Sequence, residues 1–356
     1  MKAATLFFAL LWVCVPATAE QFIEMPAVGT QRSVVNIHGA ADYPAIKPFF
    51  EMFQKQNPGV RIRYTEFNTQ VLYHHFLDTY PRTPDLMLSS AMDLQVRLVN
   101  DGYAQPYRSP ETEALPTWAR WRDEIFGFTY EPAVIAMNSG FLADERLPRN
   151  RAELLELIRR KQGQVQGRIG TFDIAKVGVG YLTWSHDSQQ SASYGRMLES
   201  FGAHEAKLFP SSASMLKALA AGDIVIAYNL LGSYAHAWAK RYPAISVILP
   251  ADYTALVMRT AFIPKNASNP EGAKKLLDLL LSREGQQLLA DHSSLYPIRE
   301  DVHGETSAGE LRKSSGSLLR PIPLGLPLLI HTDQASRRAL LTEWERAMKG
   351  SNATPP

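Results

Sequence analysis

The stretch SVVNIHGAADYPAIKPFFEMFQKQNPGVRIRY, residues 33–64, decides the fold class. Residues 33–37 are a short apolar run typical of a strand, and the small-residue loop 38–42 follows it. Residues 44–56 predict a helix, because four apolar side chains recur there at i, i+3, i+4 and i+7. An Asn-Pro-Gly sequence ends that helix, and residues 60–64 alternate as a second strand. Strand, helix and strand in this order predict a largely parallel sheet with crossover connections.

The same alternation continues along the chain, and we expect an α/β fold throughout. Further strands are predicted at residues 85–88, 133–137, 168–171, 224–228, 245–249 and 256–263. Further helices are predicted at residues 70–78, 92–100, 151–161, 190–201, 212–220 and 233–242, from residue 269 toward residue 289, and at residues 333–349.

The chain has 356 residues, which is long for one hydrophobic core and suits two lobes. We expect a discontinuous first lobe from residues 33–132 and 255–330, and a second lobe from residues 133–254. The break after residue 137 marks the first crossing between the lobes. A C-terminal helix is expected at residues 331–350, followed by a disordered tail at residues 351–356.

Residues 1–19 have the pattern of a secretory signal peptide. Lys2 supplies the positive charge, an apolar run follows, and Ala17-Thr18-Ala19 has the small-x-small order of a cleavage site. The apolar run is shorter than the roughly 20 residues that span a bilayer. We therefore expect cleavage after Ala19 and export to the periplasm. The alternative, an uncleaved anchor, has no use for this cleavage site.

Composition excludes several classes of function. Formal net charge is +2, so there is no basic field for nucleic acid, and charge recognition has to be local. Cys14 is the only cysteine and lies within the segment to be removed. A lipoprotein acylated at Cys14 is disfavoured by the bulky Trp12 and Val13 before it. The mature chain then has no disulfide, no thiol nucleophile and no thiolate metal site.

Motifs of the common enzyme classes are missing from the sequence. It contains no Gly-x-Ser-x-Gly elbow, no Walker loop, no His-Glu-x-x-His and no dinucleotide glycine fingerprint. His74 and His75 are adjacent on a predicted helix, so their side chains diverge by about 100° and cannot share a metal. His186-Asp187 is a pair of a kind that occurs often by chance. We expect no enzyme, no cofactor and no bound metal; an exported hydrolase is the alternative.

Three loops at the ends of predicted strands carry the candidate binding groups. Ligands of open α/β sheets collect beyond the carboxyl ends of strands, where free backbone N–H groups at helix N-termini suit anions. Small side chains let a ligand approach the backbone, and hydroxyls add donors. Each loop could instead be a plain turn or helix cap. The candidates in these loops are His38, Ser89, Ser90, Thr171, Gly178 and Gly180.

A second group of candidates combines tyrosine with a helix start. Tyr228, Ser233 and Tyr234 lie between a predicted strand and a predicted helix, and Tyr130 lies beside the first crossing. Tyrosine offers an amphipathic ring and a hydroxyl at low entropic cost, which suits a cleft that closes on a ligand. The same tyrosines could serve only in packing.

Several short blocks in a fixed order resemble the family 1 extracellular solute-binding proteins, closest to the ferric-iron-type branch of the type II periplasmic binding fold. The blocks are PDLMLSS (84–90), LVNDGYAQP (98–106), AGDIVIAYN (221–229), NPEGAK (269–274) and SREGQ (282–286) with YP (296–297). The resemblance covers almost all of the mature chain. It implies two α/β lobes that close on a ligand, a monomer, and delivery of a small molecule to an inner-membrane ABC permease.

The sequence differs at one place from the pattern of the iron-binding members. Iron-binding members carry two adjacent tyrosines after the strand that matches residues 224–228, whereas Gly232-Ser233 stands near that position here. Glycine and serine at a helix start suit a phosphate or carboxylate. We therefore expect a small anionic organic solute, phosphorylated or carboxylated. The alternatives are a ligand-sensing accessory that docks on the periplasmic domain of a sensor kinase, and a ferric-iron-binding protein.

Overall fold

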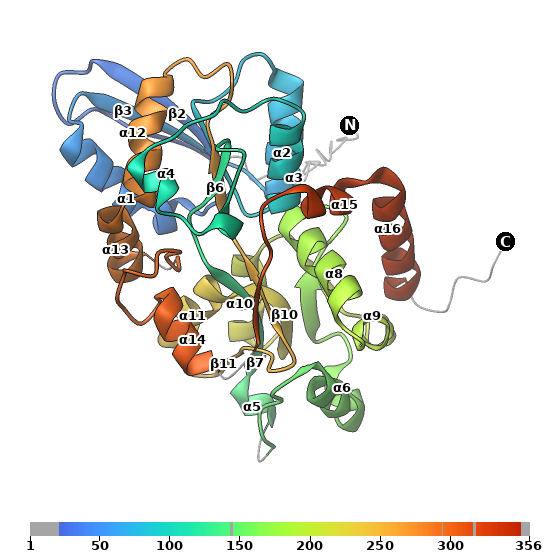
Figure 1. The fold of residues 1–356 in the computed structure, drawn as a ribbon. Coiled ribbons are helices and arrows are strands. Elements are labelled where there is room, and N and C mark those ends of the chain that lie inside the picture. Colours follow the sequence, from blue (N-terminus) through green and yellow to red (C-terminus); the bar gives the residue numbers. More distant parts are fainter. Residues whose placement is uncertain (1–20, 143–144, 294, 316–317, 350–356) are drawn as a thin grey trace, which may run out of the picture.

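The computed structural model describes residues 21–142, 145–293, 295–315 and 318–349, and shows two α/β lobes, each built on a seven-stranded sheet (Figure 1). The predicted signal peptide and the predicted tail, residues 351–356, lie outside the described residues. Among the described helices, none is long and apolar enough to cross a membrane.

The sheet of lobe 1 has a parallel centre and antiparallel edges. Its strands, in spatial order, are β1 (Gln21–Met25), β3 (Val60–Glu66), β2 (Ser33–Gly39), β4 (Leu86–Ser89), β13 (Thr260–Phe262), β6 (Ile125–Gly127) and β5 (Arg120–Trp121). β2 runs parallel to β3 and β4, so the carboxyl ends of these strands meet at one edge of the sheet. Its helices include α1 (Tyr43–Gln56), α2 (Thr69–Thr79), α3 (Met92–Asn100), α12 (Pro270–Leu281) and α13 (Arg283–His292).

Helix α1 shows how the local sequence builds lobe 1. Proline in the first turn has a backbone angle that suits a helix start, and the N–H it lacks has no partner there in any case. Ile46, Phe49, Phe50 and Phe53 form the predicted apolar stripe and are at most 1% exposed. This stripe packs against the sheet face that carries Val35, Ile37, Ile62 and Tyr64. The predicted helix and its core face are confirmed.

The sheet of lobe 2 is centred on one long strand. Its strands, in spatial order, are β14 (Leu319–Pro321), β12 (Thr254–Val257), β7 (Glu131–Asn138), β10 (Ile226–Leu231), β8 (Ile169–Phe172) and β9 (Lys207–Phe209), and β11 (Ile245–Ile248) also pairs with β7. Its helices include α6 (Arg151–Arg160), α8 (Gly178–Gln190), α9 (Tyr194–Ala203), α10 (Ser212–Ala221) and α11 (Gly232–Arg241).

Two short segments join the lobes and hydrogen-bond to each other. Residues 128–130 lead from β6 into β7, and Met258 and Arg259 lead from β12 into β13. The backbone N–H of Phe128 donates to the carbonyl of Arg259 (2.8 Å), and the N–H of Arg259 donates to Oγ1 of Thr129 (2.7 Å). The predicted single strand at 256–263 is therefore wrong. The run LVMRTAFI is apolar on both sides of Arg259, because both halves are buried, and Arg259 itself lies at the break.

The predicted lobe boundaries also need correction. Residues 254–257 and 319–321 belong to the second sheet, although most of them were expected in lobe 1. The first sheet includes β1, which the sequence analysis did not predict. The helix expected from residue 269 divides at Ser282, whose hydroxyl accepts from the N–H of Gly285 and caps the start of α13. The remaining predicted elements occur within a few residues of their expected positions.

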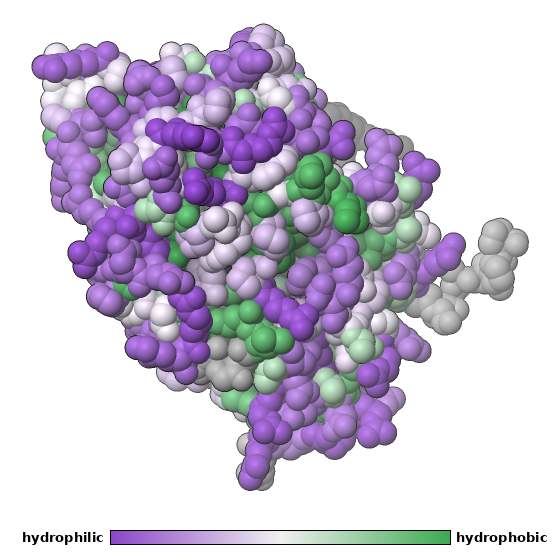
Figure 2. Space-filling model, viewed as in Figure 1, coloured by the Kyte–Doolittle hydropathy of each residue, from purple (hydrophilic) through white to green (hydrophobic). Residues whose placement is uncertain are grey.

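The C-terminal segment contacts both lobes. After β14 it forms η2 (Leu326–Leu328) and α15 (Leu329–Thr332), which pack on α3, and then α16 (Gln334–Met348), which packs on α9. Leu318, Leu326 and Ile330 on this segment are more than half exposed. Figure 2 shows small hydrophobic areas in the middle of a largely hydrophilic face, where this segment crosses from one lobe to the other.

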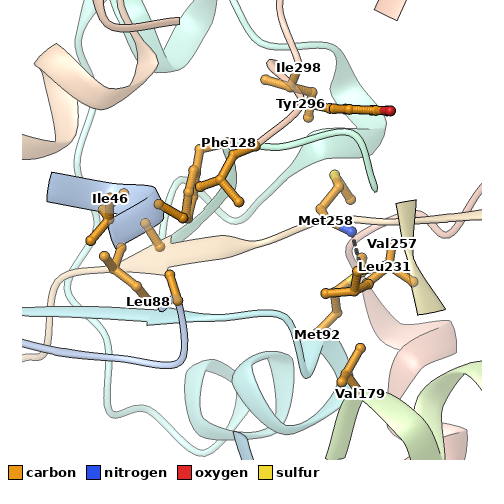
Figure 3. Close-up of a cluster of buried hydrophobic side chains, with 14 of the residues drawn as sticks. Ile46, Leu88, Met92, Phe128, Val179, Leu231, Val257, Met258, Tyr296 and Ile298 are labelled. Atoms are coloured by element: carbon orange, nitrogen blue, oxygen red, sulfur yellow. Dashed lines mark hydrogen bonds between the residues drawn. The ribbon is translucent and has the colours of Figure 1, made fainter. Parts of the chain in front are cut away.

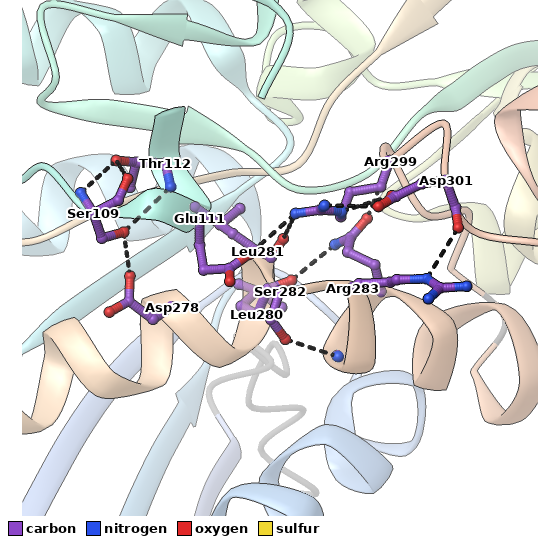
Figure 4. A network of polar contacts seen from close by, with 12 residues as sticks. Ser109, Glu111, Thr112, Asp278, Leu280, Leu281, Ser282, Arg283, Arg299 and Asp301 are labelled. Atoms are coloured by element: carbon purple, nitrogen blue, oxygen red, sulfur yellow. Dashed lines mark hydrogen bonds and ion pairs between the residues drawn. The ribbon is translucent and has the colours of Figure 1, made fainter. Parts of the chain in front are cut away.

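A polar network ties the outer loops of lobe 1 to its helices (Figure 4). The hydroxyl of Ser109 donates to Asp278 of α12 (2.6 Å). The guanidinium of Arg299 contacts Glu111 (3.0 Å) and Asp301 (2.8 Å). These contacts hold the segment after α13 against lobe 1, next to the first crossing.

Candidate functional site

The junction of the lobes gathers a set of polar side chains that we name the interlobe polar cluster. Its members come from the loop after β2, the start of β7, the first turn of α11 and the second crossing segment. They meet because the carboxyl ends of β2 and β4 lie beside β13, and because β7 and β10 pair antiparallel, which places the start of α11 against the start of β7. The cluster consists of Asp42, Glu131, Ser233, Tyr234 and Arg259.

Arg259 lies at the centre of the cluster and is 1% exposed. Its Nε donates to Oε1 of Glu131 (3.3 Å), and its Nη1 donates to the carbonyl of Ala40 at the end of β2 (3.1 Å). The guanidinium carbon lies 5.3 Å from the ring centroid of Tyr234, a cation–π arrangement. Arg259 therefore contacts both lobes from the segment that joins them.

Three buried polar atoms of the cluster have no hydrogen-bond partner among the described residues. They are Nη2 of Arg259, Oε2 of Glu131 and Oγ of Ser233, and the Ser233 hydroxyl lies beside the Glu131 carboxylate without a well-aligned hydrogen bond between them. Native proteins satisfy nearly all buried polar groups, because an unsatisfied one costs about 1–3 kcal/mol and more when charged. Three such atoms in one place indicate a position where a ligand or water completes the hydrogen bonding.

Burial sets the protonation behaviour of the two acids. Burial raises the pKa of Glu131, and the charge of Arg259 and the hydroxyl of Ser233 act in the opposite direction. Burial also raises the pKa of Asp42, opposed by Arg259 and by the hydroxyl of Tyr234. The Tyr234 hydroxyl in turn accepts from the backbone N–H of Asp42 (3.4 Å), which links lobe 2 to the start of α1.

Beside the cluster, the lobes close over apolar side chains. Met92 of α3 and Met258 of the crossing segment belong to the same buried cluster as Val179 and Leu231 of lobe 2 (Figure 3). Oγ1 of Thr69 at the start of α2 accepts from the N–H groups of Gly178 (3.0 Å) and Val179 (3.4 Å). The lobes therefore meet through packed side chains as well as polar contacts.

Gly178, a predicted site residue at the start of α8, lies at this contact between the lobes, where there is little space for a side chain. A Cβ added to Gly178 would lie 2.9 Å from the Cβ of Ala91 and 3.1 Å from Leu94. The loop after β4 and the start of α8 thus touch across the interface, as expected for facing loops. Ser90 is buried in the loop after β4, and the Ser89 hydroxyl accepts from the N–H of Ala91 in a local turn.

Two of the predicted contacts lie inside lobe 2, away from the junction. Tyr228 packs with Trp184 and Phe201 in the second core cluster. Its hydroxyl accepts from Nε of Arg151 (2.7 Å) and donates to Asp187 (2.8 Å). Oγ1 of Thr171 accepts from Nε1 of Trp184 (2.9 Å). These side chains are fully engaged within the lobe and serve its packing.

The buried ion-pair network around Tyr228 explains why this residue turns inward. Arg151 and Asp187 are both at most 2% exposed and contact each other at 3.2 Å. Asn229 follows Tyr228 at a bulge of β10 with φ of 61°, and its amide donates to Asp187 (2.8 Å). The bulge moves the strand end, so the predicted strand at 224–228 lies two to three residues early.

Two further predicted site residues, Tyr130 and Gly180, lie outside the interlobe polar cluster. Tyr130 is buried beside Trp118, and its N–H donates to the carbonyl of Tyr296 (2.9 Å). Gly180 contacts the side chain of Phe172 within lobe 2. Only Ser233 and Tyr234, of the predicted side chains, join the interlobe polar cluster.

His38 points to the opposite face of lobe 1. Its ring contacts those of Phe67 and His75 at a tilt of 58°, and it lines a groove of about 380 Å³ together with Arg63 and Arg82. Burial lowers the pKa of His38 to about 4, and the nearby His75 acts in the same direction. His38 is therefore neutral at pH 7 and does not face the junction.

Sequence reasoning missed the residues that define the cluster. The predicted strand at 256–263 includes Arg259, and neither Arg259 nor Glu131 is among the predicted site residues. Each is the one charged residue in its apolar run, LVMRTAFI and FTYEPAVIAM. The opposite charges in these two apolar runs were the available signal, although the first crossing was expected after residue 137 and lies at residues 128–130.

Two open α/β sheets, two joining segments and polar groups from both lobes at the junction define a two-lobed binding protein. The family model of the bacterial extracellular solute-binding proteins matches residues 35–292. The chain belongs to this family and is a solute-binding protein of the ABC-transporter type. Proteins of this kind deliver their ligand to a membrane permease.

Solved structures and one curated relative agree with this placement. A substrate-binding protein of an ABC transporter from Agrobacterium tumefaciens is 34% identical, with a TM-score of 0.87 over 93% of this chain and 99% of that one. AfuA from Actinobacillus pleuropneumoniae, solved with fructose-6-phosphate, shares the fold at 15% identity, with a TM-score of 0.74 over 90% and 99%. Iron uptake protein A1 of Synechocystis is 23% identical over 81% of this chain and 83% of its own length.

Proposed function

We propose that this protein captures a small anionic organic solute between its lobes and hands it to an inner-membrane permease. The chain is exported by cleavage after Ala19 and acts as a monomer in the periplasm. The solute carries a phosphate or carboxylate group. Ligand binding stabilises the closed arrangement of the lobes, and the permease recognises this closed form.

One observation carries the proposal: Arg259 is a buried cation between the lobes with one donor, Nη2, left without a partner. A guanidinium keeps its charge when buried, and the free Nη2 can donate to a carboxylate or phosphate oxygen while Nε and Nη1 hold Glu131 and Ala40. The first turn of α11 adds the backbone N–H groups of a helix start beside it. An anionic group here would contact the joining segment and lobe 2 together.

Closure follows from where these groups sit. Arg259 belongs to the segment that joins the lobes, Ala40 and Asp42 belong to lobe 1, and Ser233 and Tyr234 belong to lobe 2. A ligand held by Arg259 therefore adds contacts that exist only when the lobes are together. This differential binding is what a ligand needs to shift the population of a hinged protein.

Isothermal titration calorimetry with phosphorylated, carboxylated, neutral and ferric ligands tests the proposal. We expect binding of anionic organic solutes by the wild-type protein, and at least about tenfold weaker binding by Arg259→Lys, because one ammonium group cannot replace the contacts to Glu131 and Ala40 and also donate to the ligand. Arg63→Lys, on the outer face of lobe 1, is the matched control and should bind as the wild type does. Binding of neutral sugars alone, or of ferric ion alone, would overturn the proposal.

A sensing role uses the same closure and makes a different prediction about partners. In that case the loaded protein would dock on the periplasmic domain of a sensor kinase. Reconstitution with the permease in vesicles distinguishes the two: ligand uptake that depends on this protein supports transport. Mass spectrometry of a ligand that co-purifies with the native protein would identify the solute directly.

A further inference from the structure

The surroundings of Arg259 contain more acid than a site for a simple anion needs. Glu131 contacts the guanidinium directly, and the charges of Asp42 and Arg259 act on each other. Glu66, whose carboxylate accepts from the N–H of Tyr43 (2.8 Å), lies close enough to influence Asp42. Three carboxyl groups thus gather around one guanidinium at the junction of the lobes.

This excess of acceptors disfavours a ligand that consists only of negative oxygens. Oε2 of Glu131 is buried and unpartnered, and a carboxylate oxygen can only accept hydrogen bonds while it is ionised. An inorganic anion beside it would meet like charge at close range, which raises the free energy of the complex. A hydroxyl or amine group would instead donate to this oxygen and satisfy it.

We propose that the ligand is a hydroxylated or amino-substituted organic anion, whose anionic group binds Arg259 and whose neighbouring donor group binds Glu131. This inference rests on the proposed function and narrows its ligand class. Nη2 of Arg259 holds a phosphate or carboxylate oxygen, Oε2 of Glu131 accepts from the adjacent hydroxyl or amine, and Oγ of Ser233 donates to or accepts from the same part of the ligand.

The three unpartnered atoms support this division of roles. One is a donor, one is an acceptor, and the third, a hydroxyl, can be either. All three side chains are at most 1% exposed, so bulk water does not satisfy them by default. Because Arg259 and Glu131 contact each other, the groups that satisfy them have to be neighbours on the ligand. Hydroxyacids, amino acids and phosphorylated polyols have this arrangement.

Matched pairs of probes test the inference by calorimetry on the full mature protein. Glycerol 3-phosphate is compared with propyl phosphate, and lactate with propionate, so that each pair shares an anionic group and differs in hydroxyls. We expect the hydroxylated member of at least one pair to bind about 100-fold or more tightly than its partner, because the partner leaves a buried acceptor unpaired.

Two variants test whether Glu131 and Ser233 cause the preference for the hydroxylated probe. Glu131→Gln should reduce the preference for the hydroxylated probe at least about tenfold, because it removes the charged acceptor. Ser233→Ala leaves the Arg259–Glu131 contact in place and should reduce the preference by a smaller factor. Glu24→Gln, which removes an exposed carboxylate from the far side of lobe 1, is the matched control and should leave the preference unchanged.

The outcomes separate this inference from the proposed function. Equal binding of both members of each pair overturns the inference and leaves the anionic ligand in place. A preference that survives in both Glu131→Gln and Ser233→Ala also overturns it. Binding of no anionic probe, with or without hydroxyls, counts against the proposed function itself.

Discussion

Nε of Arg259 donates to Oε1 of Glu131 at 3.3 Å, and this ion pair joins the two segments that connect the lobes. Both side chains are at most 1% exposed. A buried ion pair is weak ground for stability, since desolvation offsets much of its attraction. Its position at the junction, with an unpartnered atom on each side chain, makes a binding role the better explanation.

Breaking this pair from one side should destabilise the protein. Arg259→Met leaves Glu131 buried without its cation, and we expect the free energy of unfolding at pH 7 to fall by about 3–5 kcal/mol. The double variant Arg259→Met with Glu131→Leu should recover most of that loss, because neither charge remains. Urea denaturation followed by circular dichroism measures both. Ligand affinity should stay lost in the double variant; its return would contradict the role of the pair in binding.

A variant of Tyr228 tests whether this residue serves in packing or contacts the ligand. Tyr228→Phe removes the hydroxyl that links Arg151 and Asp187, so the unfolding free energy should fall by about 1–3 kcal/mol. Ligand affinity should change less than about twofold, because the hydroxyl is engaged inside lobe 2. Denaturation and calorimetry give the two readouts, with the exposed Tyr242→Phe as control. A large loss of affinity with unchanged stability would restore Tyr228 as a ligand contact.

The contact between Thr69 and the start of α8 should favour the closed state. Thr69→Val keeps the shape of the side chain and removes the acceptor for Gly178 and Val179. A net hydrogen bond is worth about 0.5–1.5 kcal/mol, so ligand affinity should fall by about 2- to 12-fold. Calorimetry measures the loss, and small-angle scattering reports whether the unliganded protein opens. Thr65→Val, on the outer face of lobe 1, should change neither quantity.

Asp93 should make stability depend on pH. It is fully buried in the first turn of α3, and neither carboxylate oxygen has a hydrogen-bond partner among the described side chains. Burial raises its pKa from 3.8 to about 6, opposed by backbone N–H groups and by Arg337 of α16. The protonated form is therefore favoured in the folded state, and the stability that it contributes is complete below pH 3.8 and is lost as the pH rises through about 6.

Asp93→Asn removes this dependence. Relative to the wild type, the unfolding free energy of the variant should increase as the pH rises from about 4 to about 7, by up to about 3 kcal/mol. Urea midpoints measured across this range give the difference between the two proteins. A difference that does not vary with pH would show that Asp93 titrates normally in the folded protein.

The sequence predicted local structure well where apolar residues recur at a helical spacing or where a capping sequence marks the start of a helix. The stripe of α1 and the Asn269-Pro270-Glu271 start of α12 each follow from chemistry within a few residues. Prediction failed where one largely apolar run contributes strands to two sheets, as at β12 and β13, because the single charged residue Arg259 was not interpreted as a break. It also failed for β1, an edge strand whose partner β3 lies about forty residues away in the chain.

The candidate site was the less predictable part. Ser233 and Tyr234 were identified from their place at a helix start, and Gly178 from its place before α8. Whether Tyr228 points to the junction or to the core depends on Arg151, Asp187 and the bulge at Asn229, which are far apart in sequence. The partners of a polar group, not its identity, decide whether it is free to bind a ligand.

The sequence by itself determined the α/β class, the order of most elements and the resemblance to solute-binding proteins, because these depend on local periodicity and short blocks of residues. Only the tertiary structure decided which polar side chains meet. Arg259 and Glu131 are 128 residues apart, and they meet because the crossing segments 128–130 and 258–259 lie side by side. Burial of both at that crossing, which no local pattern encodes, leaves one donor and one acceptor without a partner among the described residues, and the proposed ligand binding rests on these two atoms.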